Sequence, residues 1–167
     1  MKKLIIILFL ISLSSIFINQ DESIIIPNQA IRFRVIANSN SLEDQTEKMI
    51  IKDQVEKEIY NLINGAQNVS EVRTLLQDNM NVIEQIVDDY DVPYEISYGD
   101  NYFPPKSYKG VLYQAGNYES LVITLGEGVG NNFWCVLFPP LCLLENSEED
   151  ISDVDYQLYV QKLIQGF

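Results

Sequence analysis

The stretch that decides the fold is Ile31-Arg32-Phe33-Arg34-Val35-Ile36-Ala37-Asn38. Its β-branched and aromatic residues alternate with other side chains, which predicts a strand with Ile31, Phe33, Val35 and Ala37 on one face. The next residues, Asn38-Ser39-Asn40-Ser41, are short and polar and therefore end the strand.

Two apolar stripes with helical spacing follow this strand. The first helix begins at Ser41 or Asp44, either of which can cap it, and Glu47 adds a capping-box residue. It ends at Asn64-Gly65, because glycine readily adopts the left-handed conformation that terminates helices. The second helix begins at about Ser70. The stripes consist of Met49, Ile50, Val55, Ile59, Leu62 and Ile63, and of Val72, Leu75, Leu76, Met80, Ile83, Ile86 and Val87.

The rest of the chain is mostly β-structure. Residues 94–98 alternate, Gly99-Asp100 marks a turn, and residues 103–108 form an edge segment interrupted by proline. Further strands are expected at residues 112–125 and 133–138, followed by a C-terminal helix (or strand) at residues 153–165. The expected fold is α+β: an antiparallel β-sheet with an antiparallel helix pair packed on one face.

The glycine-rich segment of residues 126–132 is the one stretch that suggests a phosphate loop. A phosphate loop opens a helix, whose N-terminus then meets the anion. Here an apolar strand follows instead, so we expect a tight hairpin turn.

The N-terminus has the layout of a secretory signal. Lys2 and Lys3 precede an apolar run over residues 4–18, and polar residues then end it. As a helix this run spans roughly 22 Å, short of the roughly 30 Å hydrocarbon core. We therefore expect residues 1–20 to be a signal peptide or an N-terminal membrane anchor, residues 21–30 a linker, and residues 31–167 a single exported domain.

Composition excludes several kinds of function. The chain has 167 residues and a net charge of −13, which repels nucleic acid, because nucleic-acid binding depends on cations that contact phosphates. It contains no histidine, which removes the usual nucleophile–histidine pairs and histidine-ligated zinc. We expect a protein that is not an enzyme, with no cofactor, no metal and no small-molecule substrate.

The two cysteines, Cys135 and Cys142, flank Pro139-Pro140. Fully extended, this segment would hold them about 24 Å apart, whereas a disulfide needs Cα atoms within about 7 Å. A turn with a cis peptide bond before Pro140 would bring them together. In an exported domain we expect a disulfide, and the alternative is a pair of buried free thiols.

Residues 133–144 form an apolar run that has two interpretations. It is a core strand with its return, or it is an exposed docking surface on which Trp134 and Phe138 are anchors, because aromatic residues dominate interface energetics.

Two stretches of the sequence resemble the stage II sporulation protein R family. The first is residues 31–39 followed by Asp44-Gln45. The second runs from Ala115-Gly116-Asn117-Tyr118-Glu119-Ser120-Leu121 through Gly126-Glu127-Gly128 to residues 132–142, where Phe133 stands in place of the family's usual second tryptophan.

The resemblance implies a signalling role. Members of this family are exported across the forespore membrane into the space between forespore and mother cell. There they activate a membrane-embedded aspartic protease, stage II sporulation protein GA, which processes the sigma-E precursor. The membrane would be contacted only through the N-terminal segment. On this basis the residues expected to bind the partner are Trp134, Phe138, Asn38, Glu127 and Asn132.

Two other functions remain open from the sequence. One is a carboxylate-based enzyme acting on peptidoglycan, which would need two carboxyl groups that converge in a cleft. The other is a structural interaction module of the septal envelope.

Overall fold

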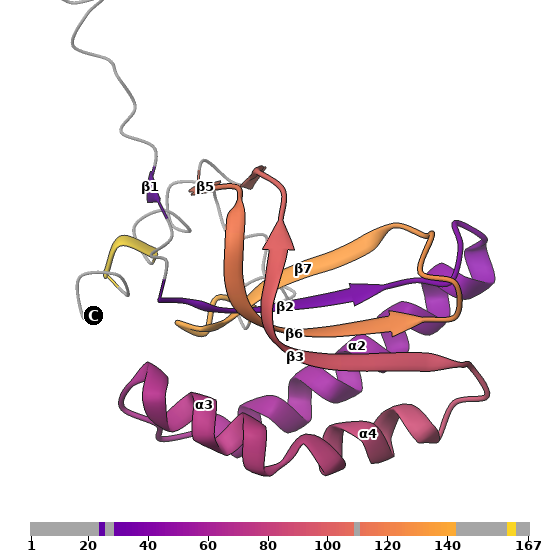
Figure 1. Ribbon diagram of the computed structural model, residues 1–167, viewed down its shortest axis with the longest axis horizontal. Helices are drawn as coiled ribbons and strands as arrows, with labels where there is room; N and C mark the ends of the chain where they lie inside the picture. Colours follow the sequence, from indigo (N-terminus) through magenta and orange to yellow (C-terminus); the bar gives the residue numbers. More distant parts are fainter. Residues whose placement is uncertain (1–23, 26–28, 109–110, 143–159, 163–167) are drawn as a thin grey trace, which may run out of the picture.

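A computed structural model describes residues 24–25, 29–108, 111–142 and 160–162 (Figure 1). A layer of helices covers one face of a large sheet, and a small second sheet lies beyond the other face (Figure 1). This is the α+β architecture expected from the sequence. The expected signal or anchor lies outside the described residues. So does most of the expected C-terminal element, of which residues 160–162 are helical.

Four strands form the large sheet, in the order β3-β6-β2-β7. They are β2 (Ile31–Ile36), β3 (Tyr94–Phe103), β6 (Gly116–Leu125) and β7 (Asn132–Phe138). β2 runs parallel to β6 and antiparallel to β7, while β3 runs antiparallel to β6. The sheet expected to be antiparallel is therefore mixed, because its central pair is parallel.

Three helices cover one face of this sheet: α2 (Leu42–Ile63), α3 (Val69–Asp78) and α4 (Met80–Asp88). The Ser41 hydroxyl accepts a hydrogen bond from the Asp44 N–H at 3.1 Å and so caps α2. Gly65, with φ of 89°, follows the end of α2 as expected. The second expected helix is in fact two helices separated at Asn79, and its N-cap is Asn68 rather than Ser70.

The helices and the sheet enclose one apolar core. The inward face expected for residues 31–37 is confirmed, because its apolar side chains are fully buried. The core residues with no exposed surface include Ile31, Phe33, Val35, Ile51, Val55, Ile59, Val72, Leu76, Ile83, Val87, Leu121 and Ile123.

The small sheet consists of three short strands in the order β1-β5-β4. They are β1 (Ile24–Ile25), β4 (Lys106–Tyr108) and β5 (Val111–Tyr113). β1 lies in the stretch expected to be a linker. Val111 and Tyr113 of β5 pack with Val136 of β7 in a second apolar cluster. The small sheet therefore covers part of the large sheet's outer face, the face turned away from the helices.

Residues 126–131 do not form the expected tight hairpin. β6 and β7 lie on opposite sides of β2, so the segment that joins them crosses the C-terminal end of β2. The turn expected at Gly99-Asp100 is also absent. β3 continues through both residues and pairs with β6 along its whole length. The strands around residues 126–131 were predicted without their neighbours, whereas only the first half of β3, residues 94–98, was predicted as a strand.

Candidate functional site

The two motif stretches of the sequence meet at the end of β2. We call this contact between residues 37–45 and residues 126–132 the loop junction. The Asn38 side chain accepts a hydrogen bond from the Glu127 N–H at 2.9 Å and donates one to Asp44 at 3.1 Å. The Asn40 side chain accepts from the Asn131 N–H at 2.7 Å. The side chains after β2 thus hold the crossing segment in place.

Backbone contacts complete the loop junction. The Val129 N–H donates to the Asn38 carbonyl at 3.2 Å, and the Gly130 N–H donates to the Ala37 carbonyl at 2.9 Å. A Cβ atom at Gly130 would lie 2.2 Å from the Ser39 carbonyl oxygen. A Cβ atom at Gly126, whose φ is 54°, would lie 2.2 Å from the Asn38 Oδ1. These two glycines are required because the loop and the residues after β2 touch directly.

Asp44 and Lys48 extend the loop junction into α2. The Ser39 hydroxyl, together with Ser41 and Asn38, holds the pKa of the Asp44 carboxyl below its ordinary value. The Lys48 ammonium donates to the Gln45 side chain at 2.7 Å and to the Asn131 carbonyl at 3.1 Å. Burial lowers the pKa of Lys48. The loop junction therefore uses most of its polar groups internally, except the Asn132 Oδ1, which is buried and has no hydrogen-bond partner among the described residues.

A second cluster lies on the outer face of the large sheet, around Trp134. The Trp134 ring is partly exposed and meets the Phe103 ring edge-on, with centroids 5.1 Å apart. The Arg34 guanidinium lies 4.4 Å from the Trp134 ring centroid. Trp134 and Arg34 are direct neighbours across β7 and β2. Phe103 and Arg34 hold the Trp134 ring in place, while part of Trp134 and part of Arg34 stay open to solvent.

Arg32 is the neighbouring cation on the outer face, and it is buried, with 2% of its surface exposed. Its guanidinium lies 3.4 Å from the centroid of the Tyr118 ring, and 5.2 Å and 5.9 Å from those of Phe103 and Tyr113. Burial lowers the pKa of Arg32, while the Tyr118 and Tyr113 phenols act in the opposite direction. The group stays charged, because arginine is not deprotonated in proteins.

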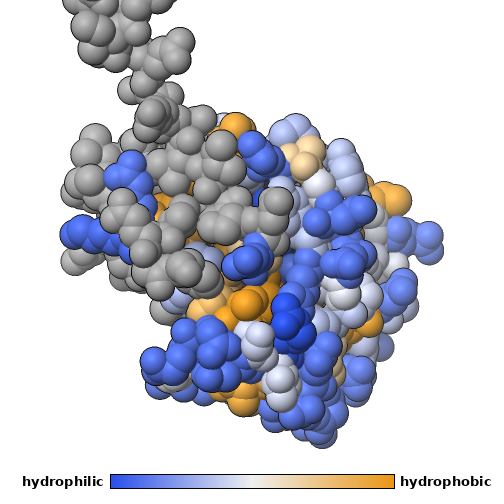
Figure 2. Space-filling model, turned by 60° about the vertical axis from the view of Figure 1, so that its left-hand side comes forward, coloured by the Kyte–Doolittle hydropathy of each residue, from blue (hydrophilic) through white to orange (hydrophobic). Residues whose placement is uncertain are grey.

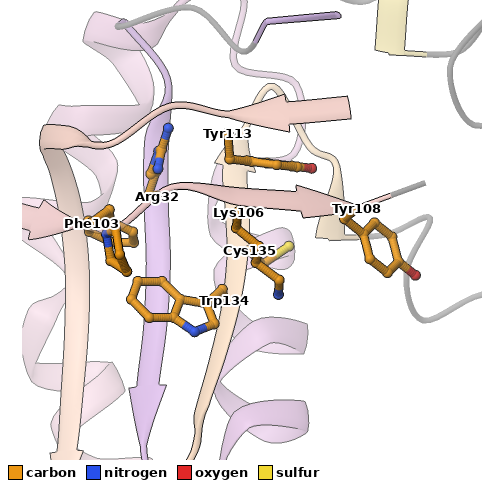
Figure 3. Close-up of a pocket in the computed structure, with 8 residues that line it drawn as sticks. Arg32, Phe103, Lys106, Tyr108, Tyr113, Trp134 and Cys135 are labelled. Atoms are coloured by element: carbon orange, nitrogen blue, oxygen red, sulfur yellow. The ribbon is translucent and has the colours of Figure 1, made fainter. Parts of the chain in front are cut away.

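Arg32 lines a cavity of about 20 Å³ between the two sheets. Figure 3 shows Arg32 and Trp134 projecting from the large sheet, with Lys106, Tyr108 and Tyr113 coming from the small sheet. Lys106 and Pro104 are exposed, so they border the opening. We call this cavity the Arg32 pocket. Among the described residues, its lining contains two cations and no carboxylate.

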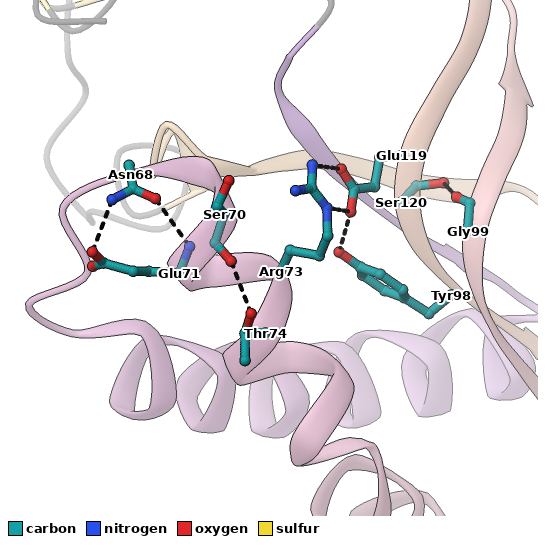
Figure 4. Close-up of polar contacts among 9 residues, drawn as sticks. All are labelled: Asn68, Ser70, Glu71, Arg73, Thr74, Tyr98, Gly99, Glu119 and Ser120. Carbon is teal, nitrogen blue, oxygen red and sulfur yellow. Dashed lines mark hydrogen bonds and ion pairs between the residues drawn. The ribbon is translucent and has the colours of Figure 1, made fainter.

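On the helix side of the large sheet, by contrast, an arginine and a glutamate pair with each other. Arg73 of α3 binds both oxygens of Glu119 on β6, at 2.6 and 2.7 Å, and the Tyr98 hydroxyl donates to Glu119 at 2.7 Å (Figure 4). Hydrogen bonds from Arg73, and secondarily from Tyr98, lower the pKa of Glu119, although burial opposes them. This bidentate pair fastens α3 to the sheet. The carboxylate is thus occupied in holding the fold.

The cysteine pair closes the turn after β7. The Cys135 and Cys142 sulfurs lie 1.97 Å apart and the Cα atoms 5.5 Å apart, a geometry compatible with the expected disulfide. The cis bond expected before Pro140 instead precedes Pro139. The chain then turns back, and the Leu141 N–H donates to the Val136 carbonyl at 3.2 Å.

The five residues expected to bind a partner lie in three places. Asn38, Glu127 and Asn132 are together at the loop junction, where Asn38 is engaged internally and Glu127 is exposed. Trp134 is on the outer face. Phe138 is partly buried against the helix-side core at the far end of β7. Their roles in binding remain predictions.

Sequence reasoning missed Arg32, Arg34, Phe103 and Lys106 as parts of a site. The available signal was a pair of arginines two positions apart on one strand, in a chain with only 11 basic residues. That signal does not show which residues surround the arginines, because the aromatic rings that bury Arg32 come from β3, β5 and β6.

Two other kinds of site were considered on the described part of the chain. Within it, no cluster of three potential metal-binding side chains occurs, and no helix is both long and apolar enough to cross a membrane. Figure 2 shows one side of the molecule, on which hydrophobic residues form small areas among hydrophilic ones. A binding site on the described residues is therefore to be sought in specific side-chain clusters.

Comparison with known proteins gives two matches. The family model of stage II sporulation protein R matches residues 27–148. Stage II sporulation protein R of Bacillus subtilis (strain 168) is 38% identical over 135 residues, which cover 77% of this chain and 60% of that protein. This chain thus matches less than two thirds of the relative's length. No solved structure matches.

Proposed function

The chain belongs to the stage II sporulation protein R family, and on that premise we propose that it is an exported signal that activates a protease during sporulation. The protease would be the membrane-embedded aspartic protease stage II sporulation protein GA, which would then process the sigma-E precursor. The observation that carries the proposal is the family match over residues 27–148, because it includes both motif stretches.

Export is the first step of the proposal. Lys2, Lys3 and the apolar run over residues 4–18 have the layout of a secretory signal. They would take the domain across the forespore membrane into the intermembrane space. The oxidising conditions outside the cytoplasm would favour a disulfide between Cys135 and Cys142, whose sulfurs are already in position.

Activation of the protease would follow from differential binding. A ligand shifts its partner to an active state only by binding that state more tightly. A hundredfold preference corresponds to roughly 2.7 kcal/mol. One buried aromatic or arginine contact at the centre of an interface is enough to supply this difference.

We propose that the outer face around Trp134 makes this contact. Tryptophan and arginine are the residue types most enriched among interface hot spots. Phe103 and Arg34 already hold the Trp134 ring, so binding would cost little side-chain entropy. Glu127 and Asn132 would contribute a secondary contact at the loop junction, and Asn38 would act by holding the loop.

The proposal assigns no catalysis to this chain. The sequence has no histidine. Glu43 and Glu47 line one shallow groove, but they lie one turn apart on α2, so they do not face each other across a substrate. A glycosidase needs carboxyl groups on two sides of the scissile bond. This arrangement supports a ligand more than an enzyme.

The test is reconstitution in a non-sporulating host. The exported chain, the protease and the sigma-E precursor are co-expressed, and precursor cleavage is followed by gel mobility. We expect cleavage only when all three are present. Omitting each component in turn is the control. Unchanged cleavage without this chain, or no cleavage with all three folded and correctly located, would refute the proposal.

A further inference from the structure

The Arg32 pocket contains a buried cation whose hydrogen-bonding capacity is only partly used within the described residues. The Nε and one Nη nitrogen of Arg32 are buried and have no hydrogen-bond acceptor within the described ranges. Leaving a buried donor unsatisfied costs about 1 to 3 kcal/mol, and more when it is charged. The aromatic rings around Arg32 stabilise its charge from their faces. A hydrogen bond with the Tyr118 phenol also favours the charged form, whereas the Nε and one Nη nitrogen have no acceptor among the described residues.

Another buried cation among the described residues has carboxylate partners. Lys52 on α2 has no exposed surface and lies 4.6 Å from the Phe133 ring centroid. Unlike Arg32, it also forms ion pairs, at 2.8 Å with Glu56 and at 2.7 Å with Asp53. Arg32 has the aromatic contacts, but no described carboxylate pairs with it.

The charges around the Arg32 pocket also favour a carboxylate as its ligand. Lys106 borders the opening and forms no ion pair with any described residue. Arg34 lies beside it against Trp134. On the strands of the large sheet, the only carboxylate whose register places it on this face is Glu95. In a chain of net charge −13, the outer face is thus a local concentration of cations.

From these observations we infer that the Arg32 pocket is a carboxylate-binding subsite, and that its occupant is an aspartate or glutamate side chain of the protein partner. The carboxylate would accept hydrogen bonds from the free nitrogens of Arg32 and an ion pair from Lys106, with its aliphatic stem against Trp134. A cavity of about 20 Å³ holds about one water molecule, so one carboxylate oxygen would enter it while the rest of the side chain lies at the opening. This inference deepens the proposed function and rests on it for the source of the carboxylate.

The first experiment tests the subsite without the partner. Trp134 is the only tryptophan of the chain, so intrinsic fluorescence reports on this pocket alone. Propionate, which resembles the end of a glutamate side chain, is titrated into the purified protein, with propionamide as the neutral control. We expect a saturable change with propionate and none with propionamide.

Variants define the residues responsible. We expect Arg32→Gln to weaken propionate binding at least about tenfold and Lys106→Gln about threefold. Lys57→Gln removes an exposed cation from α2, on the other side of the sheet, and should change nothing. If Arg32→Gln does not fold, the Arg32 Nε–H resonance of the wild-type protein serves instead, and it should shift on propionate addition. An absent response in the wild-type protein would overturn the inference and leave the proposed function standing.

The second experiment tests the source of the carboxylate. Lys106→Glu places a negative charge at the mouth of the pocket, and we expect it to abolish precursor cleavage in the three-component assay. Full cleavage with this variant, despite propionate binding by the wild-type protein, would overturn the assignment to the partner. So would propionate binding that emerges only after the acidic side chains of residues 145–153 are neutralised, because this chain would then be the occupant. Failure of the wild-type protein in that assay would refute the proposed function by itself.

Discussion

The loop junction and the Arg32 pocket both contain residues of the two motif stretches, yet Asn38 and Arg32 use their polar groups in opposite ways. At the loop junction, the side-chain carbonyl and amide groups of Asn38 both form hydrogen bonds within the chain. In the Arg32 pocket, two nitrogens of a buried guanidinium have no acceptor among the described residues. Membership of a motif therefore does not separate residues that hold the fold from residues available to a partner. Asn38 and Arg32 differ in whether the described residues supply partners for their polar atoms.

The largest effect is expected at Gly126, where the loop junction is tightest. Gly126→Ala would put a Cβ atom 2.2 Å from the Asn38 Oδ1 at a φ of 54°. We expect the free energy of unfolding to fall by about 3 kcal/mol, as measured by denaturant titration. Gly65→Ala is the control, since its φ is 89° but nothing lies within 4 Å, and it should cost about 1 kcal/mol. Equal losses would mean that the contact with Asn38 is not tight.

Removing the Asn38 side chain should have the next largest effect. Asn38→Ala deletes the acceptor of the Glu127 N–H and the donor to Asp44, and we expect a loss of about 2 kcal/mol. Glu127→Ala leaves that backbone contact in place and removes an exposed side chain, so its stability should stay within about 0.5 kcal/mol of wild type. If Asn38→Ala were as stable as Glu127→Ala, the internal role assigned to Asn38 would be wrong.

Acid should weaken the loop junction through Asp44. Its folded pKa lies below the ordinary value of 3.8, chiefly because Ser39 donates to it. The stabilisation is therefore complete above the unfolded pKa and is lost as pH falls through the folded pKa. We expect the stability difference between wild type and Asp44→Asn to shrink as pH is lowered through this range. A difference independent of pH would contradict this assignment.

The smallest effect on stability is expected at the Arg32 pocket. Lys106 is exposed and forms no ion pair with the described residues, so Lys106→Gln should change the free energy of unfolding by less than about 0.5 kcal/mol. A larger loss, measured by the same denaturant titration, would show that Lys106 holds the small sheet in place. Lys106 would then hold the fold as Asn38 does, and the contrast between the loop junction and the Arg32 pocket would be wrong.

Local sequence patterns predicted which segments form helices and strands better than they predicted which strands pair with each other. The strand at β2, the capping by Ser41 and the helix end at Gly65 followed from side-chain alternation and capping chemistry, which act over a few residues. The crossing of residues 126–131 over β2 did not, because alternation identifies a strand without identifying which strand it pairs with. Asn79 divides the second helix although the apolar stripe runs through it.

The candidate site was predictable in part for a similar reason. Trp134 was identified because an aromatic residue within an apolar run suggests an anchor. Arg32 was not identified, since an arginine on an alternating strand is usually exposed. Its burial depends on Phe103, Tyr113 and Tyr118, which are more than 70 positions away in the sequence. Only the folded arrangement reveals the pocket.

The most direct test of the central claim is the signalling activity of Trp134→Ala. Purified wild-type and variant domains are added to sporulating cells that lack their own copy, after circular dichroism has shown that both are folded. Processing of the sigma-E precursor is then measured against protein concentration. The account predicts that the variant needs at least about tenfold more protein or fails altogether. Full activity of folded Trp134→Ala at the wild-type concentration would contradict it.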